Sequence, residues 1–417
     1  MTAPSARHLT VAIDARARLG ESGGVDQVLV GLLSGISQLD DNGDESYVLL
    51  GYPESSEWLE EFVGPCCRIE PVSGRAARLI SKSRRALRIP ARRRLAPTSD
   101  GTVERLGADV IHFPRQRAFV TSVPSIYLPH DLQHRHHPEF FSARDIDQRE
   151  RLYSTFCRQA ALVTVMTQAA RADVAEAYGI DPDRIAVVSW PPAFLAKPRL
   201  ASKDVERLRA MLSLPPRFVF FPAQTWPHKN HATLFKAVAM LREQGVEVPL
   251  VLSGRETSAT PKLRQLAVQL KIDHQIRWLG FVEEGEVEAA YRSATCVVYP
   301  SKFEGWGMPV LEALYFRVPL ICSDIDHLPE LVGDAALVVD PDDPRALADA
   351  IRSIWCDEEV ARRLASRAAT RSWDRDWVDV ARDFRAQYRY VADANLLAAD
   401  LERLRRQGLP LRHLSRS

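Results

Sequence analysis

PSKFEGWGMPVLEALYFRVPLICS, residues 300–323, is the stretch that decides the fold. An apolar run precedes it and another, 319–322, lies near its end, a pattern that predicts strand, loop, helix and strand. Pro309 suits the first turn of the helix, where its missing N–H costs nothing. We therefore expect Glu304 on the loop and Glu312 in the first helical turn.

The loop of this unit carries groups that suit a phosphorylated, hydroxyl-rich ligand. Gly305 and Gly307 allow the backbone to approach a ligand closely, and the N–H groups of a helix N-terminus bind anions. Glu304 and Glu312, eight positions apart, can accept hydrogen bonds from sugar hydroxyls. The helix dipole alone also favours a glutamate near this end, so the pattern by itself leaves a structural and a functional interpretation open.

Length and composition predict a globular protein of two or more domains. The chain has 417 residues, 46% of them hydrophobic, and a formal net charge of +1. No apolar run reaches the roughly 18–20 residues that a membrane span needs, and the N-terminus lacks the apolar core of a signal peptide. The six cysteines have no metal-type spacing. We expect buried thiols and a cytoplasmic protein.

Strand and helix patterns alternate along the chain, which is typical of doubly wound parallel sheets. A strand at 9–14 leads into a loop with Gly23 and Gly24, and a helical pattern follows it. A proline-rich stretch at 190–202 predicts a linker, after which the alternation restarts near 218. We expect an α/β protein with two doubly wound sheets.

A basic segment interrupts the first half. No acidic residue occurs at 71–99, while basic residues are crowded from Arg75 to Arg94 with apolar residues between them. Such an amphipathic segment can bind an anionic membrane surface, and a solvated surface insertion is the alternative. The segment has no aromatic residues for stacking bases, so we expect no nucleic acid partner.

Histidines follow the strand predicted at 125–128. They are His130, His134, His136 and His137. Their spacing fits no standard metal site, and we expect none. His130 directly follows the carboxyl end of a sheet strand, where doubly wound folds bind ligands, so it is the functional candidate of this group.

Lys229 holds a comparable place in the second half. It follows a strand predicted at 218–221 and precedes a helix for which Asn230 is a plausible N-cap. A phosphate there would meet both the lysine charge and backbone N–H groups. The alternative is an ordinary surface lysine.

Taken together, the motifs resemble those of the family-4 retaining glycosyltransferases of the GT-B fold, which has two Rossmann-like domains. The resemblance covers about residues 9–390. The matching motifs are the E-x7-E pair of Glu304 and Glu312 in its P-S-x-x-E-G-x-G-x-P setting, VPLICS at 318–323, PELVGDAALVVDP at 329–341, LGFV at 279–282, the lysine loop at Lys229, and HDL at 130–132.

The resemblance implies a domain plan for the chain. Residues 1–195 are expected to form an acceptor-binding Rossmann-like domain with the basic insertion at about 71–99. Residues 203–380 are expected to bind the nucleotide-sugar donor, across a deep cleft from the first domain. Residues 381–417 would form a C-terminal helix that packs back on the first domain, with a basic tail that frays from 401 onward.

The resemblance also implies site residues. Those implied as catalytic are His130, Lys229 and Glu304. Those implied as donor-binding are Gly23, Gly24, Gln224, Arg255, Phe281, Val282, Gly305, Trp306, Gly307, Met308 and Glu312. Lys229 would neutralise the leaving diphosphate, Glu304 would orient hydroxyls of the sugar, and Glu312 would bind the ribose hydroxyls. His130 would contact the transferred sugar, and the backbone near Phe281 would meet the base.

One position departs from the family pattern. The family often has an arginine five positions before the lysine, and here that position is Gln224. A positive charge on the diphosphate is therefore missing, and Arg255, at the end of the next strand, is a candidate substitute. The departure is also the sole support for a non-catalytic nucleotide-sugar-binding scaffold.

The activity implied by the resemblance is transfer of a hexose, mannosyl or glucosyl, from a UDP- or GDP-sugar. Retention would follow from same-face attack, with the leaving phosphate taking the acceptor proton. We identify no D-x-D-like pair that would call for a metal, so no metal and no cofactor are expected. The expected acceptor is a glycan or a lipid-linked glycan of the cell envelope, at the inner face of the membrane. A soluble sugar phosphate or natural-product aglycone is the alternative acceptor.

Overall fold

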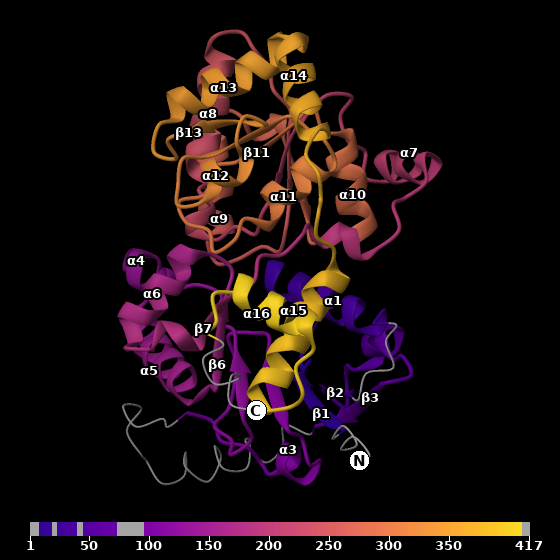
Figure 1. The fold of residues 1–417 in the computed structure, drawn as a ribbon. Coiled ribbons are helices and arrows are strands. Elements are labelled where there is room, and N and C mark those ends of the chain that lie inside the picture. Colours follow the sequence, from indigo (N-terminus) through magenta and orange to yellow (C-terminus); the bar gives the residue numbers. More distant parts are fainter. Residues whose placement is uncertain (1–7, 19–22, 40–44, 73–95, 411–417) are drawn as a thin grey trace, which may run out of the picture. The chain divides into compact units, whose positions relative to one another are not determined.

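The computed structural model describes residues 8–18, 23–39, 45–72 and 96–410 (Figure 1). The chain divides into two compact units, the first made of Met1–Trp190 with Arg375–Ser417 and the second of Pro191–Asp374. The basic segment predicted from Arg75 to Arg94 lies outside the described residues. None of the described helices is both long and apolar enough to span a membrane.

The first unit contains a seven-stranded parallel sheet in the order β3-β2-β1-β4-β5-β6-β7. Its strands are β1 (Leu9–Asp14), β2 (Glu45–Gly51), β3 (Cys67–Pro71), β4 (Val110–Phe113), β5 (Ser125–Tyr127), β6 (Leu162–Val165) and β7 (Ile185–Val187). Its α-helices are α1 (Gly24–Ser37), α3 (Thr102–Arg105), α4 (Gln133–His136), α5 (Ala143–Gln159), α6 (Gln168–Tyr178), α15 (Trp377–Val391) and α16 (Ala398–Arg406). The sequence patterns missed β3, an edge strand that is only half buried.

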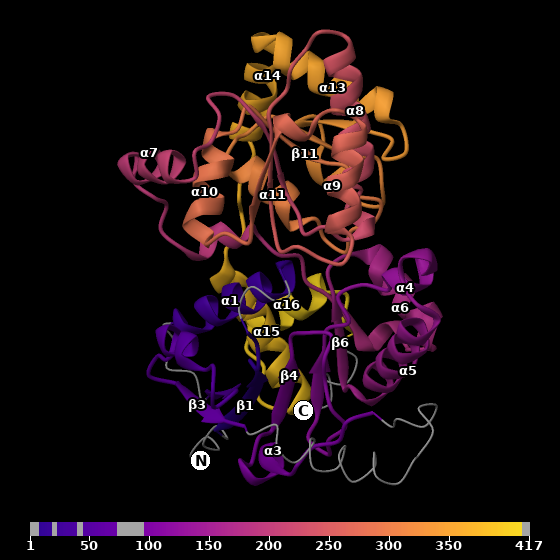
Figure 2. The same cartoon turned by 180° about the vertical axis from the view of Figure 1, so that it is seen from behind.

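Helices cover both faces of this sheet. On one face, Phe113 of β4 packs in a core cluster with Phe156 of α5. On the other face, the ring centroid of Tyr388 in α15 lies 6.2 Å from that of Tyr47 in β2, and its hydroxyl lies 2.7 Å from Nδ1 of His112. Accordingly, α15 lies over the strands in Figure 1 and behind them in Figure 2.

The C-terminal helices belong to the first unit, and the chain returns to it at Arg375 rather than at 381. The reason is the first residue of α15, Trp377, whose ring lies against α1. A Cβ atom on Gly31 would come within 2.3 Å of that ring. The expected fraying from 401 onward is wrong for the described residues, because α16 continues to Arg406 and buries Leu404.

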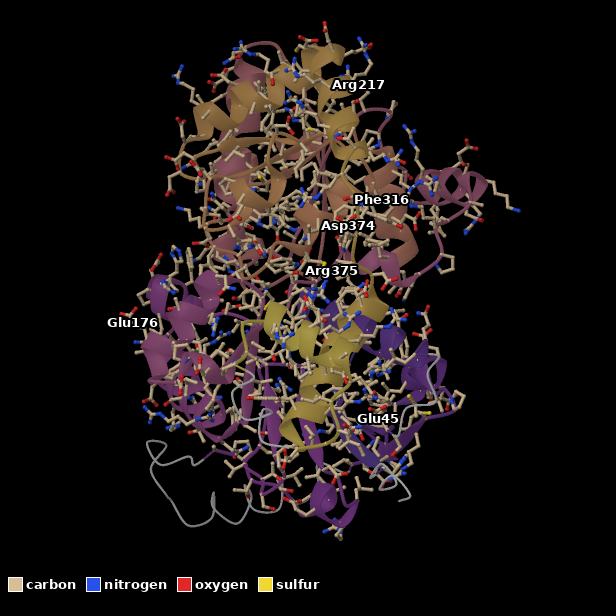
Figure 3. The ribbon with its side chains drawn as sticks, in the orientation of Figure 1. Glu45, Glu176, Arg217, Phe316, Asp374 and Arg375 are labelled. Atoms are coloured by element: carbon tan, nitrogen blue, oxygen red, sulfur yellow. The ribbon has the colours of Figure 1, made fainter. Side chains whose placement is uncertain are left out.

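A buried ion-pair network ties these helices to the sheet. The guanidinium of Arg389 in α15 pairs with Glu45 of β2 and, at 2.7 Å, with Asp400 of α16. Glu45 is labelled beside α15 in Figure 3. A buried charge is tolerated when it is paired in this way, so the network fixes how the C-terminal helices lie on the first sheet.

The second unit contains a six-stranded parallel sheet in the order β10-β9-β8-β11-β12-β13. Its strands are β8 (Val219–Pro222), β9 (Leu250–Ser253), β10 (Ile276–Gly280), β11 (Cys296–Tyr299), β12 (Leu320–Ser323) and β13 (Ala336–Val339). Its α-helices are α7 (Ser202–Met211), α8 (His231–Glu243), α9 (Thr260–Gln269), α10 (Glu284–Ser293), α11 (Met308–Tyr315), α12 (Leu328–Val332), α13 (Pro344–Cys356) and α14 (Glu358–Ala369). The prediction of two doubly wound sheets is confirmed, and the cleft expected between them stays a prediction.

The strand order of the second unit explains where its site lies. The chain runs from β8 outward to β9 and β10, and from β11 outward to β12 and β13 on the other side. The loops that follow β8 and β11 therefore part from each other at the carboxyl ends of these two strands, which is where doubly wound folds bind ligands. Val297 of β11 pairs with Phe220 of β8, so the two loops start side by side.

Candidate active site

The loop between β11 and α11 has the predicted form, with one correction. Gly307 immediately precedes α11, and Pro309 lies in the first turn. Because the helix begins at Met308, Glu312 is its fifth residue and lies in the second turn, not in the first. Glu304 lies on the loop, as predicted.

The backbone of this loop is held in place from α12. Gly307 has φ 82, and a Cβ atom there would come within 2.7 Å of the Leu328 side chain, so glycine is required for two reasons. His327 donates a hydrogen bond from Nε2 to the carbonyl of Trp306 at 2.8 Å, and the two rings stack with centroids 5.6 Å apart. The loop therefore presents its N–H groups on a fixed backbone.

Lys229, from the loop after β8, and Glu304, from the loop after β11, contact each other. The ammonium of Lys229, at the end of the 3-10 turn Pro227–Lys229, donates to Oε1 of Glu304 at 2.6 Å and to the hydroxyl of Tyr299 at 2.8 Å. Burial raises the pKa of Glu304, but the charges of Lys229 and His228 and the hydrogen bond from Lys229 more than offset this, so its pKa lies below the usual value. Glu304 is therefore ionised at neutral pH.

Glu312 has the opposite electrostatic environment. Its Oε2 accepts a hydrogen bond of 2.8 Å from the hydroxyl of Tyr291 in α10. Burial raises the pKa of Glu312 to about 8; the Tyr291 hydrogen bond opposes the rise, and the charge of Glu284 adds to it. The two glutamates of one motif therefore differ in charge at neutral pH.

Asn230 joins the two loops, and it holds the N-cap position of α8 as predicted. Its backbone is left-handed, with φ 64, and its side chain makes no capping hydrogen bond. The amide instead donates to the carbonyls of Pro300 at 3.0 Å and Pro341 at 2.7 Å. It thereby fixes the Lys229 loop to the start of the Glu304 loop.

Gln224, at the position where the family often has arginine, makes a local contact. Oε1 of Gln224 accepts a hydrogen bond of 2.6 Å from the indole of Trp226. The guanidinium of Arg255 lies 5.5 Å from the ring centroid of Phe281, which is 50% exposed and, with Val282, follows β10. Arg255 thus contacts Phe281, one of the two residues implied to meet the base.

The candidate residues of the first unit lie at the carboxyl ends of its central strands. Gly23, with φ 54, precedes α1, and Gly24 is the first residue of that helix. His130 follows β5 with φ 66 and is buried, and its Nε2 lies 2.9 Å from the carbonyl of Pro114, to which it donates. Burial lowers the pKa of His130 to about 4; the hydrogen bond to Pro114 opposes this, and the charge of Arg115 adds to it. The imidazole is therefore neutral at pH 7.

The other histidines of this loop each meet a carboxylate of their own. The pairs are His134 with Glu150 at 3.3 Å, His136 with Asp173 at 2.7 Å, and His137 with Glu139 at 3.0 Å. Among the described residues, no group of three or more histidines, cysteines and carboxylates is placed to hold a metal. Metal independence itself stays a prediction.

The sequence patterns missed three residues that shape the site, namely Tyr291, Tyr299 and His327. Tyr299 ends a strand that was predicted, and its position directly before the Pro-Ser of the motif was the available signal. Tyr291 and His327 carry no local signal, because each reaches its partner from another element.

Comparisons with known proteins place the chain in a family. Residues 22–190 match the family model described as Glycosyltransferase Family 4, and residues 204–371 match the one described as Glycosyl transferases group 1. The O-antigen chain mannosyltransferase B of Escherichia coli is 30% identical over 267 residues, which cover 60% of this chain and 70% of that protein. The D-inositol 3-phosphate glycosyltransferase of Corynebacterium efficiens is 32% identical over 239 residues, 55% of this chain and 56% of that protein.

A solved structure extends the similarity to the whole fold. The crystal structure of Anabaena HepE in complex with UDP and glucose superposes with a TM-score of 0.67 at 19% identity, over 91% of this chain and 99% of HepE. Such low identity supports the fold alone. With the matches of both halves to the family models, it leads to one conclusion: the chain belongs to the group 1, family-4 glycosyltransferases of the GT-B fold.

Proposed function

We propose that this glycosyltransferase moves a hexose, mannosyl or glucosyl, from a UDP- or GDP-sugar to a glycan or lipid-linked acceptor, with retention and without a metal. The observation that carries the proposal is the contact of Lys229, from the loop after β8, with Glu304, from the loop after β11, just before the helix α11 that holds Glu312. A cation, an ionised carboxylate and a helix N-terminus together suit the diphosphate and the hydroxyls of one donor.

The chemistry assigns a different task to each residue. Lys229 exchanges its contact with Glu304 for the diphosphate and stabilises the charge that develops as the phosphate leaves. Glu304, then released, accepts hydrogen bonds from hydroxyls of the sugar, and Glu312 accepts those of the ribose. Neutral His130 contacts the transferred sugar as a hydrogen-bond partner rather than as a cation.

Two relatives support different acceptors. The O-antigen mannosyltransferase supports a growing glycan on the cell-envelope pathway. The D-inositol 3-phosphate glycosyltransferase supports the second candidate, a small soluble acceptor that carries a phosphate. Radiolabelled donor offered to a lipid-linked glycan and, separately, to inositol 3-phosphate would distinguish them, because the products partition into organic and aqueous phases.

A thermal-shift panel of nucleotide sugars tests the donor. A ligand at 100 times its Kd adds about 2.7 kcal/mol to the stability of the protein that binds it. We expect one UDP- or GDP-sugar to raise the melting temperature in magnesium-free buffer with EDTA. No shift with any member of the panel, at millimolar concentration, would refute the proposal, and a shift that requires magnesium would refute metal independence.

The membrane part of the proposal rests on the basic residues from Arg75 to Arg94, outside the described residues. About 1 kcal/mol per basic residue near an anionic surface would hold the protein at the inner face of the cell membrane. Sedimentation with vesicles measures this. We expect binding to vesicles with phosphatidylglycerol that weakens with salt; equal binding to neutral vesicles would contradict it.

A further inference from the structure

Two buried tyrosines contact the two glutamates of the motif. Tyr299, the last residue of β11, is 1% exposed, and Tyr291, in α10, is fully buried. Their hydroxyls reach the Lys229–Glu304 pair and Glu312 respectively. A buried tyrosine hydroxyl needs a hydrogen-bond partner, and here both find theirs among the residues of the donor site.

Tyr299 holds the cation of the site on a rigid element. Its hydroxyl accepts from Nζ of Lys229 at 2.8 Å, and the ammonium also lies 5.1 Å from the centroid of the tyrosine ring. The ring itself packs edge-on against Phe221 of β8, with centroids 6.0 Å apart. When Glu304 turns toward the sugar, the Tyr299 hydroxyl remains as a fixed partner of Lys229.

Tyr291 holds the carboxyl group of Glu312 in a similar way. Its hydroxyl lies 2.8 Å from Oε2 of Glu312 and 3.2 Å from the carbonyl of Pro309. Since the hydroxyl has one hydrogen, the shorter contact to Glu312 is its main hydrogen bond. The ring stacks on Phe316, with centroids 5.4 Å apart (Phe316 is labelled in Figure 3), and meets Phe220 at a right angle. Tyr291 therefore cannot move away without disturbing the core.

We propose that Tyr299 and Tyr291 are positioning residues, each for a different part of the nucleotide-sugar donor. Tyr299 orients Lys229 for the diphosphate, and Tyr291 orients one oxygen of Glu312 so that the other oxygen faces the ribose. The inference rests on the proposed function, because it concerns how that same site binds its nucleotide.

Because the two tyrosines act on different parts of the donor, loss of each hydroxyl should weaken the binding of a different set of ligands. Loss of the Tyr299 hydroxyl weakens ligands that carry the diphosphate and leaves the nucleoside unaffected. Loss of the Tyr291 hydroxyl weakens the nucleoside and the nucleoside diphosphate by the same factor, because both contain the ribose. A hydrogen bond to a charged group corresponds to about a ten- to hundredfold change in an equilibrium constant.

The experiment is titration calorimetry of the full chain with UDP and uridine, or with GDP and guanosine if the wild type prefers them. The variants are Tyr299→Phe and Tyr291→Phe. Tyr315→Phe is the matched control, because Tyr315 is also buried in the second unit, and its hydroxyl accepts at 3.1 Å from Arg199 rather than contacting either glutamate. Circular dichroism establishes that each variant is folded.

We expect Tyr299→Phe to lower UDP affinity at least about tenfold with uridine affinity unchanged, and Tyr291→Phe to lower both by the same factor. Tyr315→Phe should change neither. Equal losses in all three variants, or no loss in the first two, would overturn the inference while leaving the proposed function intact. A wild-type chain that binds neither nucleotide would overturn the proposed function, and the inference with it.

Discussion

Donor binding should strengthen steeply as the pH rises from 6 to 8, because Glu312 must lose a proton to serve the ribose. The carboxyl group is 8% exposed, and burial raises its pKa to about 8. Compared with a carboxylate, a protonated carboxyl group has one acceptor oxygen less for the two ribose hydroxyls. We therefore take the ionised form as the one that binds. The protonated fraction therefore reduces the apparent affinity.

The size of the effect follows from that pKa. With a pKa of about 8, about 1% of Glu312 is ionised at pH 6 and about half at pH 8. If only the ionised form binds, the apparent Kd falls about fiftyfold between these two values and changes little above pH 9. An ordinary exposed glutamate is already ionised throughout this range and would give no change in Kd, so the rise in affinity with pH follows from the raised pKa of Glu312.

The assay is calorimetry with an intact nucleotide sugar, because the terminal phosphate of a free nucleoside diphosphate titrates near pH 6 and a diphosphate diester does not. Glu312→Gln is the control, since it cannot ionise. We expect its Kd to vary less than about threefold over the same range. A wild-type Kd that does not change with pH, or an equally steep Gln variant, would refute the reasoning.

Three further substitutions probe other parts of the chain. Lys229→Ala removes the cation opposed to the leaving phosphate, so release of nucleotide from the donor should slow by about a hundredfold or more with the fold intact by circular dichroism; unchanged turnover would contradict this. Gln224→Arg restores the cation that the family often has at this position. Donor affinity should therefore rise several-fold at low salt and lose that gain at high salt. Calorimetry at two ionic strengths measures both affinities. Trp377→Ala opens a cavity beside Gly31 and should destabilise the first unit by about 3–5 kcal/mol in urea unfolding, whereas a loss under 1 kcal/mol would show that the helix contact carries little energy.

The fold could be predicted from local pattern because both sheets are covered on both faces. Their strands are then continuous apolar runs, such as Val297 and Val298 in β11, and these stand out from the amphipathic helices between them. The exception is informative. The edge strand β3, Cys67–Pro71, is half exposed, so it lacks such a run, and its place was set by pairing with β2.

The candidate site was predictable where a motif is local and not where a contact is long-range. The loop with Glu304 and the helix with Pro309 followed from turn and helix chemistry. Asn230 shows the limit, because its spacing before α8 predicted the N-cap position but not that its amide donates to two carbonyls from distant loops. Whether such a side chain caps its helix or bonds elsewhere depends on positions that local sequence does not encode.

The clearest case is the difference in charge between the two glutamates. Glu304 and Glu312 are the same residue type in one motif, and nothing within that motif distinguishes their ionisation. Glu304 is ionised because Lys229 comes from the loop after β8. Glu312 keeps its proton near neutral pH because burial raises its pKa, and the hydrogen bond from Tyr291 of α10 offsets that rise only in part. Under the proposed function, Glu304 is ready to accept hydrogen bonds from hydroxyls of the sugar, whereas Glu312 must first lose its proton before it binds the ribose. In the proposed function the pair works as two separate hydroxyl acceptors rather than as an acid and base, and residues outside the motif determine the charge of each.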